Sequence, residues 1–146
     1  MTVKLFKALW FISLLAVLVV LLLVYASLPE QVVIKEENAR LITLPRDGVF
    51  FIAVALLAVL NVLVFVISKV YSHNKPFRTW FYGLIVTVNA FIMISLNLIN
   101  TFNSGERFNY SSISFIIYGS LGLIVLWAIS WPFYSLFQKI SHKQTI

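Results

Sequence analysis

Residues Trp80 to Thr101 read WFYGLIVTVNAFIMISLNLINT and form an apolar run that is long enough to cross a bilayer. The run nevertheless carries three amides, Asn89, Asn97 and Asn100. On a helix these amides fall within about 80° of one another. Because an amide is costly to expose to hydrocarbon, the sequence predicts that this stripe faces other helices.

Composition places the chain among polytopic membrane proteins. Of its 146 residues, 61% are hydrophobic and only 11% are charged, and the mean hydropathy is +0.97. Four apolar runs reach the roughly 18–20 residues that a bilayer requires. We therefore predict an all-α integral membrane protein with a single four-helix transmembrane domain over residues 1–146, whose spans cover 7–27, 48–68, 80–101 and 113–137.

Charges are distributed unevenly along the chain. The N-terminus, the loop after the second span and the C-terminal tail hold seven of the eleven basic residues and none of the five acidic ones. Basic residues close to span ends mark the cytoplasmic side, so both termini are predicted to be cytoplasmic. This pattern also explains the +6 net charge without a nucleic-acid partner. Aromatic residues that favour the membrane interface lie near span ends: Trp10, Trp80, Trp127, Trp131, Tyr71 and Tyr134.

The first span also has features of a secretory signal peptide. Lys4 and Lys7 precede the apolar run, and Val24-Tyr25-Ala26 would serve as a cleavage site. The run is long for a signal core, however. We therefore predict an uncleaved membrane span.

The loop between the first two spans is the longest and holds four of the five acidic residues. Residues 31–35 and 40–44 are rich in β-branched side chains and flank a polar turn at 36–39. The pattern predicts a short β-hairpin in this external loop, with an irregular loop as the alternative. Glu36 and Glu37 are candidates for external recognition of a partner, with a solvated turn as the other interpretation.

Asn61 is the central polar residue of the second span. Counted from the span ends, it lies at nearly the same depth as Asn89, so we predict a hydrogen bond between these two amides. Asn97 lies deeper toward the outer face and is expected to contact the first or fourth span or an external subunit. Alternatively, the asparagine stripe could line a polar path or bind a lipid or quinone head group.

The last span contains small residues on one face. Gly119 and Gly122 share that face with Ser130, which is typical of tight helix contact. Trp131-Pro132 is predicted to kink or end the helix. The preceding polar loop, residues 102–112, includes the potential glycosylation triplet Asn109-Tyr110-Ser111.

Residues that carry chemistry are scarce. The chain has no cysteine, which excludes disulfides and thiolate chemistry. His73 and His142 lack the spaced partners that a metal site needs. No charged residue falls inside a predicted span, whereas proton relays and voltage sensors usually place one there. We therefore expect no catalytic, cofactor-binding or metal-binding residue, and no enzymatic activity.

One segment resembles a known family. Tyr25-Ala26-Ser27-Leu28-Pro29, followed by Val32-Val33-Ile34 and a second span that begins with glycine, is similar to the small bacterial membrane proteins of the DUF1648 family, which includes the N-terminal part of SdpI-type immunity proteins. The resemblance covers residues 25–60. The Pro-His pair of that family is replaced here by Val33-Ile34-Lys35. The resemblance implies a bacterial envelope, and hence a multi-pass protein of the bacterial cytoplasmic (inner) membrane.

These observations favour a small accessory or scaffolding subunit that packs against a larger inner-membrane complex. Its expected partners are other integral membrane subunits and the lipid bilayer. The residues expected to contact helices or partners are Asn61, Asn89, Asn97, Asn100, Gly119 and Gly122. The alternative is a small transporter, channel or immunity-type protein that acts alone or as a homo-oligomer. An enzyme acting on lipid is a third class, disfavoured because no acid–base pair is present.

Overall fold

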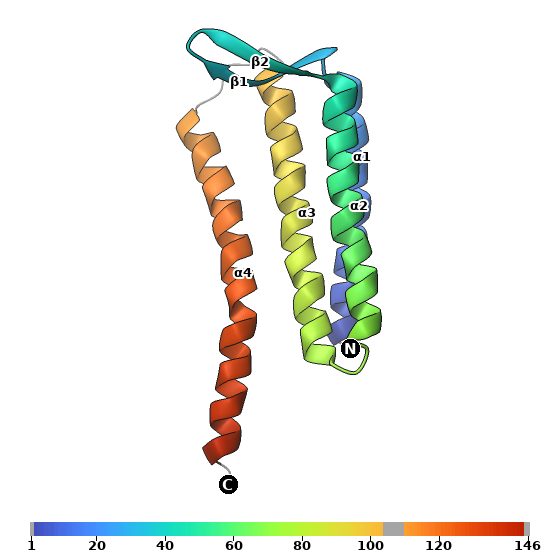
Figure 1. Cartoon of the computed structure of the whole chain (residues 1–146), viewed down its shortest axis with the longest axis vertical. Coiled ribbons are helices and arrows are strands. Elements are labelled where there is room, and N and C mark those ends of the chain that lie inside the picture. Colours follow the sequence, from blue (N-terminus) through green and yellow to red (C-terminus); the bar gives the residue numbers. More distant parts are fainter. Residues whose placement is uncertain (1, 104–109, 145–146) are drawn as a thin grey trace.

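The computed structural model of the protein describes residues 2–103 and 110–144. It consists of four long helices and a two-stranded antiparallel sheet (Figure 1). All four helices are long and apolar enough to cross a membrane, as predicted. In chain order the elements are α1 (Thr2–Ser27), β1 (Gln31–Glu37), β2 (Arg40–Pro45), α2 (Arg46–Val70), α3 (Lys75–Asn103) and α4 (Tyr110–Gln144).

Helices α2, α3 and α4 extend beyond the predicted spans at both ends, and α1 extends beyond its span at the N-terminal end. The largest difference is in α4, which continues through Pro132 to Gln144, so Trp131-Pro132 does not end the helix. A proline removes one backbone hydrogen bond, a loss that a long apolar helix tolerates when neighbouring contacts hold it. Residues 104–109 of the preceding polar loop, Asn109 included, lie outside the described residues.

The short turn between α2 and α3 is defined by Asn74. The Asn74 side-chain oxygen accepts a hydrogen bond from the backbone N–H of Phe77 at 3.2 Å, and its carbonyl accepts one from the N–H of Arg78 at 3.1 Å. Asn74 is therefore the N-cap of α3, and Pro76 occupies the first helical turn, where its missing N–H costs nothing.

Helices α1, α2 and α3 form a bundle, and α4 lies beside it (Figure 1). Helices α1 and α3 run in the same direction and α2 runs against both. We call the end that carries the N-terminus and the α2–α3 turn the terminal end, and the opposite end the hairpin end. The apolar core extends from the middle of the bundle to the hairpin end and consists of Val17, Leu21, Val24, Leu28, Val32, Val49, Ala53, Leu57, Ile92 and Leu96.

The predicted hairpin is present and lies across the hairpin end of the bundle (Figure 1). Its turn is shorter than predicted, because Glu36 and Glu37 belong to β1 and only Asn38 and Ala39 connect the strands. Both turn residues have positive φ, 51° and 62°, as a two-residue hairpin turn of type I′ requires. Val32 of β1 is fully buried and joins the apolar core.

At the hairpin end α1 is also joined to the start of α2. The Tyr25 hydroxyl donates a hydrogen bond to a carboxylate oxygen of Asp47 at 2.7 Å. The guanidinium of Arg46 lies 4.9 Å from the centre of the Tyr25 ring, a cation–π geometry. These contacts fix how the chain leaves the hairpin and enters α2.

Asn103 connects the hairpin to the last turn of α3. Its side-chain oxygen accepts a hydrogen bond from the backbone N–H of Val33 at 2.7 Å, and its amide nitrogen donates to the Val33 carbonyl at 3.1 Å. The side chain thus pairs with β1 in the manner of a neighbouring strand. The hairpin is held against α3 by this amide as well as by burial of Val32.

We expect that Asn103→Leu will loosen the hairpin without unfolding the helices. The substitution removes both hydrogen bonds to Val33 while keeping a side chain of similar size. Hydrogen exchange in detergent should show faster exchange at the Val33 amide and unchanged exchange in the middle of α1 and α3. Asn100→Leu is the matched control, one helical turn earlier. Equal protection of Val33 in both variants would contradict the assigned role of Asn103.

Candidate functional site

A hydrogen-bond network, which we call the asparagine node, crosses the centre of the bundle. Asn89 of α3 donates to the Asn61 side-chain oxygen at 3.2 Å, and Asn61 donates to the Asn89 oxygen at 3.4 Å. The indole N–H of Trp10 donates to the same Asn61 oxygen at 2.9 Å. Asn89 also donates to the Ser13 hydroxyl at 3.1 Å. The node therefore joins α1, α2 and α3, and the pair predicted between Asn61 and Asn89 is formed.

The geometry of the node fits a role in helix association. Asn89 is fully buried and Asn61 is 9% exposed. The remaining Asn61 donor bonds the Leu57 carbonyl at 2.8 Å, and the Ser13 hydroxyl donates to the Trp10 carbonyl at 2.7 Å. A buried network whose donors and acceptors are paired stabilises one arrangement of helices.

The other two asparagines of the stripe are not part of the node. Asn97 is exposed and Asn100 is half-buried, so Asn97 is not packed between helices in the described part of the chain, and its contact with an external subunit stays a prediction. The buried line of α3 runs through Ile85, Asn89 and Leu96, and Asn97 lies about 80° around the helix from Asn89. An offset of that size takes Asn97 out of the interface with α1 and α2.

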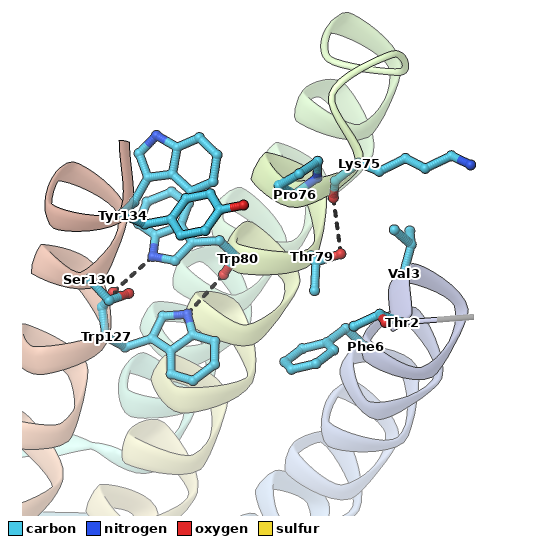
Figure 2. A pocket seen from close by; sticks show the side chains of 11 residues that line it. Thr2, Val3, Phe6, Lys75, Pro76, Thr79, Trp80, Trp127, Ser130 and Tyr134 are labelled. Atoms are coloured by element: carbon cyan, nitrogen blue, oxygen red, sulfur yellow. Dashed lines mark hydrogen bonds between the residues drawn. The ribbon is translucent and has the colours of Figure 1, made fainter. Parts of the chain in front are cut away.

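A second feature lies at the terminal end, between α1, α3 and α4 (Figure 2). It is a cavity of about 650 Å³ that we call the aromatic groove. Phe6 and Val3 of α1 face it from one side and residues of α4 from the other (Figure 2). The lining residues are Thr2, Val3, Phe6, Lys75, Pro76, Thr79, Trp80, Trp127, Ser130, Trp131 and Tyr134.

Two tryptophans hold the wall of this groove together. The indole N–H of Trp80 donates to the Trp127 carbonyl at 2.8 Å, and the indole N–H of Trp127 donates to the Trp80 carbonyl at 2.9 Å (Figure 2). Helices α3 and α4 are thus joined by a reciprocal pair of hydrogen bonds. Since both indole N–H groups are engaged, the rings present mainly apolar surface to the groove.

Gly83 makes this contact possible. It is buried, and a methyl group placed there would overlap the Trp127 ring, reaching 2.7 Å from Cε2 and closer still to Cζ2. Contacts under 3.0 Å do not occur for real Cβ atoms. The absence of a side chain at Gly83 therefore lets the Trp127 ring lie against the backbone of α3.

Gly119 and Gly122, the glycines predicted to mediate tight helix contact, have empty space beside them within the chain. A methyl group at Gly119 or Gly122 would meet nothing within 4 Å. In the described part of the chain neither glycine lies in a tight helix contact, and contact with a partner at these positions stays a prediction. The contact between α3 and α4 instead uses Gly83 and Trp127. Gly83 lies on a different face of α3 from Asn89 of the asparagine stripe, and Trp127 lies on a different face of α4 from Gly119 and Gly122.

Sequence reasoning missed the aromatic groove and the role of Asn103. It interpreted Trp80 and Trp127 as interfacial aromatics, which explains their depth but not their pairing. Gly83, the only glycine between Trp80 and Thr101, was the available signal for a close approach of another helix.

The described residues contain no cluster of three or more histidine, cysteine, aspartate or glutamate side chains that could hold a metal. His73 lies in the turn that follows α2 and is exposed. The backbone places Glu36 and Glu37 at the end of β1, beside the hairpin turn.

The similarity of residues 25–60 to the DUF1648 family stays a prediction. No family model, no curated protein and no solved structure matches the chain.

Proposed function

We propose that the protein is a small accessory or scaffolding subunit of a larger protein complex in a bacterial inner membrane, and that it contacts its partner through α4. One observation carries this proposal: α4 packs mainly against α3, meets α1 where the Phe6 ring lies beside Trp127, and leaves most of its surface open. From Phe115 to Lys143, where its side chains are described, no residue of α4 is buried. The external Glu36 and Glu37 are a second proposed contact.

The open surface of α4 includes the face with small residues. Gly119 lies about 80° from Trp127, and Gly122 about 140°, which places both glycines away from the contact with α3. Glycine in a helix interior costs about 1 kcal/mol relative to alanine, and a face that meets only lipid gains nothing in return. Because helices in lipid associate by close packing, small residues favour contact with another helix.

This proposal predicts the behaviour of the double variant Gly119→Leu/Gly122→Leu. The partner should no longer co-purify after mild detergent extraction, since two large side chains would block the helix contact. The isolated protein should stay folded, because neither glycine is packed within the chain. Gly119→Ala/Gly122→Ala is the matched control and should retain the partner, because its face remains small.

Native gel electrophoresis of the extracted protein separates this proposal from its alternative. Co-migration with unrelated larger subunits supports an accessory role. A ladder of multiples of this chain alone, or equal recovery of the partner in the leucine and alanine variants, would contradict it and favour a homo-oligomeric protein.

The proposed orientation, with both termini cytoplasmic, has its own test. Ser72, Lys143 and Asn38 are exposed in the structure, and the chain has no cysteine to cause background labelling. In intact cells a membrane-impermeant thiol reagent should label Asn38→Cys but not Ser72→Cys or Lys143→Cys. Permeabilised cells, in which all three should react, provide the control. Labelling of Ser72→Cys with silence at Asn38→Cys would reverse the orientation.

A further inference from the structure

We propose that the aromatic groove is a binding site for one anionic phospholipid of the leaflet at the terminal end. In this arrangement an acyl chain lies against the aromatic wall and the phosphate group lies near Lys75. This inference is independent of whether the protein is an accessory subunit.

The size and lining of the groove suit a lipid chain. Its volume of about 650 Å³ falls within the range of roughly 300–1,000 Å³ that small-molecule sites occupy. The rings of Phe6 and Trp127, 6.1 Å apart between centroids, are where α1 and α4 approach each other. With the indole N–H groups of Trp80 and Trp127 engaged by backbone carbonyls, the wall offers mainly apolar contact.

The rim of the groove carries the polar groups. Lys75 extends away from the aromatic wall and over Val3, and Thr79 lies beneath it (Figure 2). The Thr79 hydroxyl donates to the Lys75 carbonyl at 3.0 Å, so its oxygen lone pairs are available to a hydroxyl of the lipid head group. An ammonium at the rim and rings below it match the order of charge and hydrocarbon in a phospholipid.

Charge selects an anionic lipid over a zwitterionic one. The parts of the chain that meet the terminal end carry basic residues and no acidic residue: Lys4, Lys7, Lys69, Lys75, Arg78, Lys139 and Lys143. Each lysine or arginine near a membrane surface favours an anionic lipid by a small electrostatic amount. Without a nearby carboxylate to compete, Lys75 is available to the phosphate.

Fluorescence quenching tests the site directly. Three of the four tryptophans, Trp80, Trp127 and Trp131, line the groove, so a phospholipid with brominated acyl chains should quench most of the emission. We expect saturable quenching of the detergent-solubilised protein by brominated phosphatidylglycerol. Unbrominated phosphatidylglycerol should reverse this quenching at a lower concentration than unbrominated phosphatidylcholine with the same acyl chains.

Variants separate the groove from general attraction to a basic protein. Lys75→Gln should weaken phosphatidylglycerol binding about fivefold, the effect of one lysine near a lipid head group. Lys143→Gln removes the same charge outside the groove and should weaken binding by much less than Lys75→Gln does. Ser130→Phe should fill the groove and abolish saturable quenching by either lipid.

Three results would each overturn the proposal. The first is equal competition by the two lipids, which means an acyl chain is bound without recognition of charge. The second is equal weakening by Lys75→Gln and Lys143→Gln, which means the attraction is diffuse. The third is full quenching in a Ser130→Phe variant whose circular dichroism shows that it is folded.

Discussion

Gly83→Ala is expected to destabilise the protein, although alanine is the better helix former. The added methyl group would overlap the Trp127 ring. That ring cannot move freely, because its N–H bonds the Trp80 carbonyl at 2.9 Å and the Phe6 ring packs beside it, 6.1 Å away between centroids. Displacing it breaks the reciprocal hydrogen bonds that join α3 and α4. Overpacking of this kind costs about 1–3 kcal/mol.

The chain offers a matched control at Gly119, where the same substitution meets open space. Gly119→Ala should stabilise its helix by up to about 1 kcal/mol, so the two variants should differ by about 1–4 kcal/mol. Unfolding in mixed detergent micelles measures this difference. Near-ultraviolet circular dichroism should change only in Gly83→Ala, since the rings of Trp80 and Trp131 lie 5.7 Å apart beside the disturbed joint. Equal stability of the two variants would contradict the assigned contact.

Sequence reasoning succeeded where a local pattern has one physical solution. Apolar runs of about 20 residues in a chain with few charges favour membrane helices, because a helix satisfies all of its backbone hydrogen bonds within one segment. Two β-branched segments around a polar turn predicted the hairpin, and two amides at matching depth predicted the pair of Asn61 and Asn89. In each case the number of alternatives was small.

The same reasoning failed where the packing of whole helices decides the outcome. In a soluble protein the apolar face of a helix shows which side is buried. In a membrane protein the lipid-facing side is equally apolar, so the sequence of α4 did not show that its glycine face is open and that Trp127 makes the contact. The bond between Asn103 and Val33 joins residues 70 positions apart, and no local pattern predicts a contact of that kind.

Replacing either member of the central pair is expected to destabilise the bundle strongly. Asn89→Leu removes the acceptor and donor that face Asn61, and leaves the Ser13 hydroxyl without its partner from α3. Asn61→Leu leaves the buried amide of Asn89 underpaired and removes the acceptor of the Trp10 indole. A buried polar group that loses its partner costs about 1–3 kcal/mol, so each variant should lose about that much stability.

A double-mutant cycle tests whether the two amides act on each other. Combining Asn61→Leu with Asn89→Leu should cost less than the sum of the single variants, because the double variant leaves neither amide unpaired. The expected coupling is about 0.5–1.5 kcal/mol, the range measured for hydrogen bonds between membrane helices. Asn97→Leu on the exposed side of α3 is the control and should change stability by less than about 0.5 kcal/mol. Strict additivity would show that the hydrogen bonds between Asn61 and Asn89 contribute nothing, and that the apolar contacts around them determine how α2 and α3 associate.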